Sequence, residues 1–410
     1  MRRSIRRIAV PACVALALAA CALRPVRMMP APVPKTVAVV PAPAPLPLPV
    51  QTERFVLRPG QQVVGRVQIV KVGKHDTLSD IARRFNVGYD EIVHANPKID
   101  PWLPPVGAAI VVPTQFVLPD APHTGIVVNV AGLRLFYYPP HKRGQPQIVI
   151  THPVGIGRIG WHTPVGVTRV MWHEKNPVWR VPPSILAEHR KEGAPLPPVV
   201  GPGPDNPLGD YALHLGWPGY LIHGTNEPVG VGRRVSHGCV HLYPEDIAQI
   251  FRMVPNGTPV RVVNEPYVFG WRHGHLYMQS YGPLGDDKRP WKTRARLLAG
   301  MLTPVQRRLL ARYHQRIDWR RVRALVRDPR VVPMPVSGTG PVQEALVATL
   351  VQNRLPAGST WDGKTDLPLT DAEFNAILSG DDSASGKSRT DSLAPAGGSA
   401  RAKPATTGTR

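Results

Sequence analysis

Cysteine is scarce in this chain of 410 residues, with only Cys13, Cys21 and Cys239 present. The sequence has no C-x-x-C pair and no H-E-x-x-H element, which excludes the common zinc-binding motifs. Acidic residues are also few, 28 Asp and Glu against 50 Lys and Arg, so the formal net charge is +22. A balance this basic often indicates nucleic-acid binding, but no helix-turn-helix or zinc-finger pattern accompanies it.

Proline and glycine, in contrast, are abundant. The chain holds 49 prolines and 37 glycines, and 42% of its residues are hydrophobic. The length is sufficient for two or three domains with real cores. Because much of the proline falls in connecting segments, we expect several domains rather than one compact globule.

The first twenty residues are typical of a targeting segment. Four arginines precede a short apolar run, residues 8–20, which is too short to span a bilayer. The run ends in Leu18-Ala19-Ala20-Cys21, which resembles a bacterial lipobox. Residues 1–20 are therefore predicted to be a lipoprotein signal peptide and Cys21 the lipidated residue. The alternative is an ordinary cleavable signal with an incidental cysteine.

Cleavage of this segment would leave Cys239 as the one unmodified thiol. No disulfide framework is then possible within the chain. A lone thiol is a liability in an oxidising compartment, so Cys239 is expected to have a function. Export also argues against a nucleic-acid partner. Residues 272–330 concentrate fifteen Lys and Arg against four acids. We expect them to form either a face toward anionic cell wall or lipid, or a merely solvated surface.

Residues 21–51 carry a proline at nearly every third position. Such a run favours polyproline II at about 3 Å per residue and predicts a semi-rigid tether of roughly 90 Å. The last residues, 380–410, are rich in Ser, Gly, Ala and Thr and are predicted to be disordered.

Residues 68–113 predict a small α+β module. "VQIVKV" and "AAIVVP" read as strands that flank two short helices. In the first helix, Leu78, Ile81, Ala82 and Phe85 share one face, with Asp76 or Thr77 as cap. The second helix stops before Pro97. The predicted order is βααβ.

Residues 123–264 predict a mostly β domain. "GIVVNVAGLRLFYYPP" indicates a hairpin that turns near Ala131-Gly132, and several further runs are rich in branched and aromatic residues. One amphipathic helix is expected in "YPEDIAQIFRMV", with Pro244 at its start. Residues 265–332 suggest another hairpin and one or two basic helices, a C-terminal extension.

Cys239 lies in "VSHGCVHLYPEDI", sixteen positions after His223 in "IHGTN". A thiol reacts as the thiolate and needs a neighbouring base, cation or oriented amides. Histidine is the usual base near neutral pH, and amides around Gly238-Cys239 are a candidate oxyanion hole. Two alternatives stay open: an inert buried cysteine, and a zinc site built from His223, His237, Cys239 and His241.

These motifs resemble the signature of the YkuD-type L,D-transpeptidases. "PVGIGRIGWHTPVG" and "NPVWRVPPSI" match upstream landmarks of that family, and "GIVVNVAGLRLFYYP" and "NPKIDPWLP" point to its ErfK/YbiS branch. "DTLSDIARRF…ANP" and "IVVP" resemble a LysM domain, the peptidoglycan-binding fold. The resemblance implies a β-sandwich-like catalytic domain preceded by LysM.

By that resemblance Cys239 is the nucleophile and His223 the proton donor and acceptor. The Gly224 carbonyl would orient the His223 ring. Ser236 and Gly238 would shape the loop, and His237 would form a wall of the acyl pocket. The family usually has an arginine at the position of His241. If that arginine binds a substrate carboxylate, His241 is expected to bind it more weakly and with pH dependence.

The resemblance further implies a peptidoglycan tetrapeptide stem as donor, and as acceptor another stem, the C-terminal lysine of an outer-membrane lipoprotein, or water. Expected partners are therefore stem peptides, glycan strands and a membrane through the lipid anchor. No metal or cofactor is required. Ala22 after the lipidated cysteine favours the periplasmic face of a Gram-negative outer membrane. The alternative function is a non-catalytic lipoprotein that holds the membrane to the wall.

Overall fold

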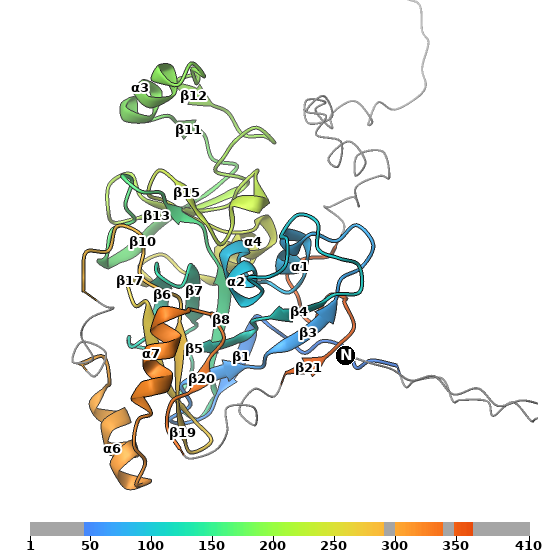
Figure 1. Ribbon diagram of the computed structural model, residues 1–410. Helices are drawn as coiled ribbons and strands as arrows, with labels where there is room; N and C mark the ends of the chain where they lie inside the picture. The colour runs from blue at the N-terminus through green and yellow to red at the C-terminus, as the bar shows by residue number, and fades with distance from the viewer. Residues whose placement is uncertain (1–44, 291–299, 339–347, 364–410) are drawn as a thin grey trace, which may run out of the picture. The chain divides into compact units, whose positions relative to one another are not determined.

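The computed structural model of the protein describes residues 45–290, 300–338 and 348–363 (Figure 1). The predicted signal peptide 1–20, Cys21, most of the predicted tether 21–51 and the predicted tail 380–410 lie outside these residues. The described residues from Leu46 onward form one compact unit. None of the helices in the described ranges has both the length and the apolar character needed to cross a bilayer.

The predicted tether extends too far toward the C-terminus. Gln352 N donates to Pro47 O, and Val50 N donates to the Gln68 side chain, both at 2.9 Å. Residues 47–50 therefore belong to the folded part of the chain, because their backbone groups bond to segments distant in sequence.

The βααβ module is confirmed. Its elements are β3 (Gln68–Lys71), α1 (Leu78–Arg84), α2 (Tyr89–Ala95) and β4 (Ala109–Val112), and the two strands pair antiparallel. α1 begins at a reciprocal cap, in which Thr77 and Asp80 each accept the other's backbone amide hydrogen. Leu78, Ile81 and Phe85 are fully buried, as their helical spacing predicts.

The mostly β domain is built on a nine-stranded mixed sheet. Two neighbouring pairs, β6 with β17 and β14 with β16, are parallel, and the other pairs are antiparallel. The predicted hairpin is present as β6 and β7. In spatial order the strands are β1 (Arg54–Leu57), β8 (Gln147–Pro153), β7 (Arg134–Tyr138), β6 (Gly125–Asn129), β17 (Pro259–Val263), β10 (Gly166–Lys175), β13 (Tyr211–Leu215), β14 (Leu221–His223) and β16 (Val240–His241).

The expected amphipathic helix is α4 (Pro244–Met253). Its buried face, which includes Ile247 and Ile250, packs into the core cluster that also holds Ile222 and Val240 from the sheet. This contact fixes the strand ends from which the histidines and the cysteine of the candidate site project.

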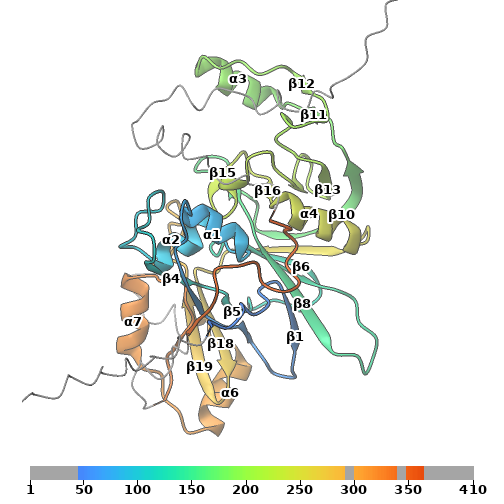
Figure 2. The same cartoon turned by 90° about the vertical axis from the view of Figure 1, so that its right-hand side faces the viewer.

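A segment between β10 and β13 is an excursion that the sequence did not predict as a helix. It contains β11 (Trp179–Arg180), α3 (Pro183–Lys191) and β12 (Val199–Val200), and β11 pairs with β12. Figure 2 shows these three elements gathered together beyond the ends of β10 and β13. Two further short elements, β9 (Ile156–Gly157) and β15 (Arg234–Ser236), pair with each other, and η1 (Pro228–Gly230) is a 3₁₀ turn.

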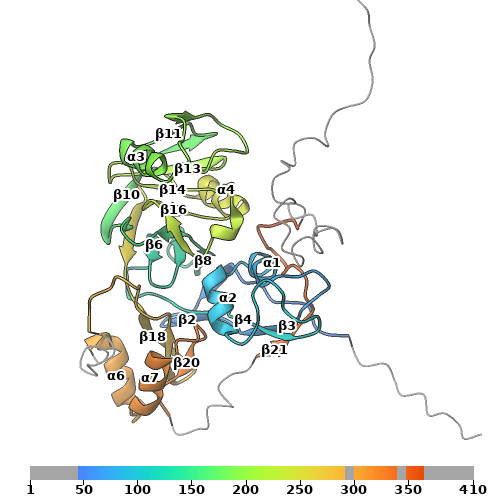
Figure 3. The same ribbon diagram turned by 45° about the horizontal axis from the view of Figure 1, so that its top comes forward.

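The C-terminal extension contains the expected hairpin, β18 (Tyr267–Arg272) and β19 (His275–Ser280), with β20 (Met334–Pro335) added to its edge. Where one or two helices were expected there are two, α6 (Pro304–Arg312) and α7 (Trp319–Arg327), which lie beside β18 and β20 in Figure 3. Leu310, Val322 and Val326 are buried in a separate apolar cluster with the hairpin.

Long-range strand pairing joins segments that are far apart in the sequence. β1 precedes the βααβ module yet pairs with β8 of the large sheet. β21 (Thr349–Leu350) pairs parallel with β3, more than 280 positions earlier, and β2 (Val63–Gly65) pairs with β5 (Gln115–Val117). The sequence pattern did not predict these pairings, because they depend on contacts between distant segments.

Candidate active site

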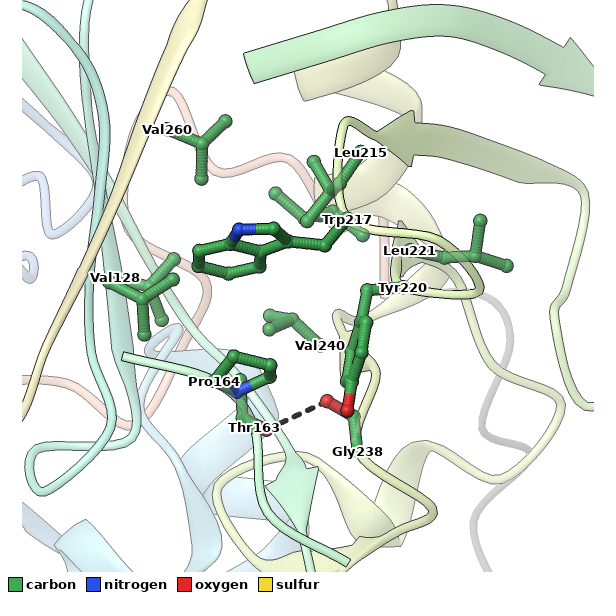
Figure 4. A pocket seen from close by; sticks show the side chains of 12 residues that line it. Val128, Thr163, Pro164, Leu215, Trp217, Tyr220, Leu221, Gly238, Val240 and Val260 are labelled. Carbon is green, nitrogen blue, oxygen red and sulfur yellow. Dashed lines mark hydrogen bonds between the residues drawn. The ribbon is translucent and has the colours of Figure 1, made fainter. Parts of the chain in front are cut away.

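Cys239 lies immediately before β16, at the end of the loop that returns from β14. Gly238 precedes it with a φ of +110°, a conformation that L side chains rarely adopt. Thr163 Oγ1 donates to Gly238 O at 2.8 Å, the dashed contact in Figure 4, and accepts from Gly157 N at 3.0 Å. A neighbouring loop therefore holds the backbone turn that presents the cysteine.

Ser236 closes the same turn from within. Its hydroxyl donates to Cys239 O at 2.6 Å and accepts from Gly238 N at 3.2 Å. The sequence suggested the amides around Gly238 and Cys239 as an oxyanion hole. The Gly238 amide hydrogen, however, is already donated to the Ser236 hydroxyl within the turn. In this conformation, the expectation is wrong for Gly238.

His223 ends β14, and its position is set by strand pairing. The parallel register pairs His223 with His241, and Cys239 comes two residues before His241. Residues two apart along an extended segment share one face, and adjacent strands lie about 4.8 Å apart. Cys239 lies one residue before β16, and the same alternation continued by one position would put it on the face of the sheet that carries His223.

The His223 ring is buried, with one nitrogen committed. Nδ1 lies 2.6 Å from Gly224 O. A carbonyl only accepts, so Nδ1 carries the hydrogen and Nε2 keeps its lone pair as a base. Burial, followed by the nearby His241, lowers the pKa of His223 to about 3. The ring is neutral near pH 7 and able to take a proton from a reacting group.

The Cys239 thiol is also neutral at rest. Sγ donates weakly toward Gly219 O at 3.7 Å, and burial raises the pKa of Cys239 to about 11. The sequence pattern suggested a thiolate supported by a cation or base. The neighbouring histidines are held neutral, so the arrangement fits transfer of the thiol proton to a base during attack better than a standing thiolate.

His241 differs from its expected role. Its side chain is 4% exposed, and its ring lies against Gly155 and Gly230, where a Cβ would collide with or crowd it. Burial lowers the pKa of His241 to about 4. A neutral, enclosed ring offers no charge to a substrate carboxylate near pH 7, so the pH-dependent binding role expected for it does not fit this structure.

His237 contacts the excursion between β10 and β13. Its Nε2 lies 3.0 Å from Glu188 of α3 and 2.9 Å from Arg158 Nη2, and Arg158 also pairs with Glu188. Burial, with the charge of Arg158, lowers the pKa of His237. In the part of the chain that the structure describes, no group of three or more His, Cys, Asp or Glu side chains could hold a metal ion. The four residues of the zinc alternative do not form such a group.

A small apolar cavity lies beside the cysteine turn (Figure 4). Trp217, Tyr220 and Pro164 line it together with Gly238. A Cβ at Gly238 would lie 3.1 Å from the Tyr220 ring, so this ring approaches the turn closely.

Sequence reasoning did not single out Thr163, Arg158, Glu188 or Tyr220. Thr163 and Arg158 fall within "PVGIGRIGWHTPVG", which was quoted as a landmark without roles for single residues. Glu188 and Tyr220 carried no signal in the sequence, because folding alone brings them to the site. Glu188 contacts His237, 49 residues later in the chain, and the Tyr220 ring lies close to Gly238.

Comparisons with known proteins agree with these motifs. The YkuD L,D-transpeptidase catalytic domain matches residues 123–262, and the LysM domain matches residues 70–113. The chain is 41% identical over 215 residues to the probable L,D-transpeptidase YcfS of Escherichia coli, covering 51% of this chain and 66% of that protein, just under two thirds.

Two further relatives are similar over more of their length. YbiS of Escherichia coli, also a probable L,D-transpeptidase, is 41% identical over 233 residues, 56% of this chain and 74% of that protein. The probable L,D-transpeptidase ErfK/SrfK of Salmonella typhimurium is 36% identical over 286 residues, 69% of this chain and 90% of that protein. The chain therefore belongs to the L,D-transpeptidase family, in the group of ErfK, YbiS and YcfS, and joins a LysM domain to a YkuD catalytic domain.

Proposed function

We propose that the protein is a peptidoglycan L,D-transpeptidase in which Cys239 is the nucleophile and His223 the general base and acid. The observation that carries the proposal is the state of His223. Its Nδ1 is committed to the Gly224 carbonyl, and burial keeps the ring neutral on the face that carries Cys239. A neutral imidazole with one unprotonated nitrogen is what a resting thiol needs for activation.

In the first half-reaction Sγ of Cys239 attacks the carbonyl of the third residue of a tetrapeptide stem, a diaminopimelate. The thiol proton moves to Nε2 of His223 as the S–C bond forms. When the tetrahedral intermediate collapses, the C–N bond to D-Ala breaks and His223 protonates the departing amine. A thioester on Cys239 and free D-Ala result. The high pKa of the resting thiol fits this order, because the proton leaves only as the bond forms.

In the second half-reaction an amine attacks the thioester. His223 removes a proton from that amine and returns it to Sγ as the C–S bond breaks. A second stem as acceptor would yield a three-to-three cross-link. The C-terminal lysine of an outer-membrane lipoprotein would yield a link between membrane and wall, which is the acceptor that we favour. Water would make the protein a carboxypeptidase.

The remaining proposals concern location. The LysM domain would hold glycan strands, and Cys21 would carry the lipid anchor after removal of residues 1–20. We place the protein in the periplasm of a Gram-negative bacterium, anchored to the outer membrane, on the basis of the lipobox-like end of that segment and Ala22.

The test is mass spectrometry of products after incubating the signal-free protein with a disaccharide tetrapeptide and a lysine-ended lipoprotein peptide. Wild type and Cys239→Ala are run side by side. We expect a stem–peptide conjugate and released D-Ala with wild type and neither with the variant. Three-to-three dimers alone would move the acceptor to another stem.

If wild type leaves both substrates unchanged while both proteins still bind the cell wall, the proposed catalysis is wrong. The result would favour the alternative, a non-catalytic wall-binding protein. A matched control is Cys239→Ser, which keeps the size and a hydroxyl hydrogen for the Gly219 carbonyl. A thermal denaturation curve of each variant shows that any loss concerns chemistry and not folding.

A further inference from the structure

The loop that carries Cys239 is bonded to the LysM domain through backbone groups. Tyr89 N donates to Val231 O at 3.2 Å, and Asp90 N donates to Gly232 O at 3.1 Å. Tyr89 and Asp90 are the first residues of α2, whose amides have no partner within the helix. Carbonyls of the active-site loop satisfy these amides, so the two domains share a hydrogen-bonded backbone contact.

Two glycines make this contact possible. Gly232 has a φ of +81°, and a Cβ on it would overlap the backbone of Gly88 and Tyr89. From the other side, a Cβ on Gly88 would lie 2.7 Å from Gly232 Cα. Real Cβ atoms do not approach other atoms so closely, so any side chain at either position must push the loop and the LysM domain apart.

Side chains also anchor both helices of the LysM domain, α1 and α2, to the catalytic domain. Glu91 accepts from Gly88 N at 2.7 Å and pairs with Arg134 of β7 at 2.6 Å, where both side chains are almost fully buried. Arg83 of α1 forms two parallel hydrogen bonds, at 2.9 and 3.0 Å, with Glu245 at the start of α4. The LysM domain is therefore fixed to the catalytic domain and does not hang from it by a linker.

The contact lies within the segment that forms the active site. From Gly232 the chain enters β15 and reaches Cys239 seven residues later. Two residues before Gly232, Gly230 lies against the His241 ring, and His241 pairs with His223. A displacement of Gly232 would therefore shift the turn at Cys239 on its C-terminal side. On its N-terminal side it would shift Gly230, which contacts the His241 ring next to His223.

We propose that the LysM domain positions the active-site loop, with Gly88 and Gly232 as positioning residues, so that acylation of Cys239 depends on this contact. The inference rests on the proposed function and adds a second task for LysM besides glycan binding. A misplacement of about 1 Å at a reacting group can lower a rate about a hundredfold, so a backbone contact of this kind is able to control turnover.

The experiment compares Gly232→Ala with Gly257→Ala. Both glycines lie in the catalytic domain with a φ of +81°, but a Cβ at Gly257 meets nothing within 4 Å. The two substitutions therefore carry similar backbone strain, and only the first disturbs the LysM contact. Gly88→Ala disturbs the contact from the LysM side at an ordinary φ of −81°. Gly107→Ala is a control within LysM that adds backbone strain, at a φ of +81°, but meets no neighbour within 4 Å.

Three quantities are measured on each full-length, signal-free variant. They are the second-order rate of Cys239 acylation by a carbapenem, the rate of alkylation by iodoacetamide, and the fraction bound to peptidoglycan sacculi. In Gly232→Ala and Gly88→Ala we expect acylation to fall by about tenfold or more while sacculus binding stays constant. Alkylation is expected to be unchanged or faster, because a displaced turn exposes the thiol. The two controls should stay within about twofold of wild type.

Acylation at the wild-type rate in both contact variants would overturn the inference, and so would an equal loss in Gly257→Ala. If Gly232→Ala does not fold, Gly88→Ala decides, because it adds no backbone strain. A wild-type protein that iodoacetamide alkylates but that neither carbapenem nor stem peptide acylates would contradict the proposed function instead. The two failures are therefore distinguishable.

Discussion

Two buried histidines of this protein, His223 and His152, have opposite charge preferences. Burial and the neighbouring His241 lower the pKa of His223, and the other groups that act on it are backbone carbonyls. Burial alone would also lower the pKa of His152, but the charge and hydrogen bond of Asp246, together with the charge of Glu53, outweigh burial and raise it. Two buried rings thus have pKa values shifted in opposite directions, downward for His223 and upward for His152.

The surroundings of His152 explain its structural role. It lies on β8, and its Nδ1 is 3.0 Å from Asp246 Oδ1 at the start of α4. The same oxygen accepts from Asn86 of the LysM domain at 2.9 Å and from Thr360 Oγ1 at 2.6 Å. This cluster joins four segments of the chain. Carboxylates thus raise the pKa of a buried histidine above its ordinary value, whereas backbone carbonyls are too weak to offset the effect of burial.

The largest expected effect comes from replacing the two histidines one at a time. We expect His223→Gln to lower kcat/KM for acylation by about 10²- to 10⁴-fold with little change in Tm, because it removes the base and not a core ion pair. His152→Gln should lower Tm and change kcat/KM by less than about tenfold. Steady-state kinetics and thermal denaturation of both variants provide the check. Similar kinetic losses in both would remove the distinction between the two sites.

The next effect concerns the cluster around His152. Asp246→Asn should lower the free energy of unfolding by about 3 kcal/mol, because it leaves a buried histidine without its counter-charge. As control, Asp328→Asn removes a carboxylate whose side chain is 64% exposed and which pairs with Arg330. That change should cost less than about 1 kcal/mol. Chemical denaturation measures both values, and equal losses would show that the cluster contributes no more than a surface pair.

The smallest effect is on the pH dependence of stability. The folded pKa of His223, about 3, is below the unfolded value of 6.5, so its contribution to stability is lost as pH falls below 6.5. His152 acts in the opposite direction: its folded pKa is raised, so its contribution is present below pH 6.5 and is lost as pH rises through the folded pKa. Between pH 6.5 and 4, wild type should lose up to about 1.4 kcal/mol per pH unit more than His223→Gln does.

Denaturation at pH 7 and pH 5 measures this difference. Parallel stability curves for wild type and His223→Gln would mean that His223 titrates alike in the folded and unfolded states. For His152 the informative range lies above pH 6.5: as pH falls through its raised folded pKa to 6.5, wild type should gain stability relative to His152→Gln, and parallel curves in that range would remove the contrast.

Local sequence patterns predicted much of the fold. The spacing of Leu78, Ile81 and Phe85 predicted α1, and "YPEDIAQIFRMV" predicted α4. Periodicity works here because a helix face and its caps involve residues within a few positions. It did not predict α3, the pairing of β1 with β8, or that of β21 with β3, because these depend on segments brought together only by folding.

The residues of the candidate site likewise fall into those that the sequence predicted and those that only the fold brought to the site. Residue type and spacing picked out Cys239 and His223, because acyl transfer by a thiol needs a nucleophile and a base. They also suggested a charged role for His241 that burial against Gly155 and Gly230 removes. The partners of His237, which are Glu188 and Arg158, have no signature in the sequence around it.

The sequence by itself determined the chemistry available to this protein: the thiol of Cys239, the imidazole of His223 and the glycine turn before Cys239, in a chain that joins LysM to a YkuD domain. Only the tertiary structure decided how that chemistry is set. It lowered the pKa of His223, raised the pKa values of His152 and Cys239, and placed Gly88 against Gly232. The physical reason is that covalent spacing defines which groups exist, whereas pKa and position depend on burial and on neighbours that only the fold brings within reach.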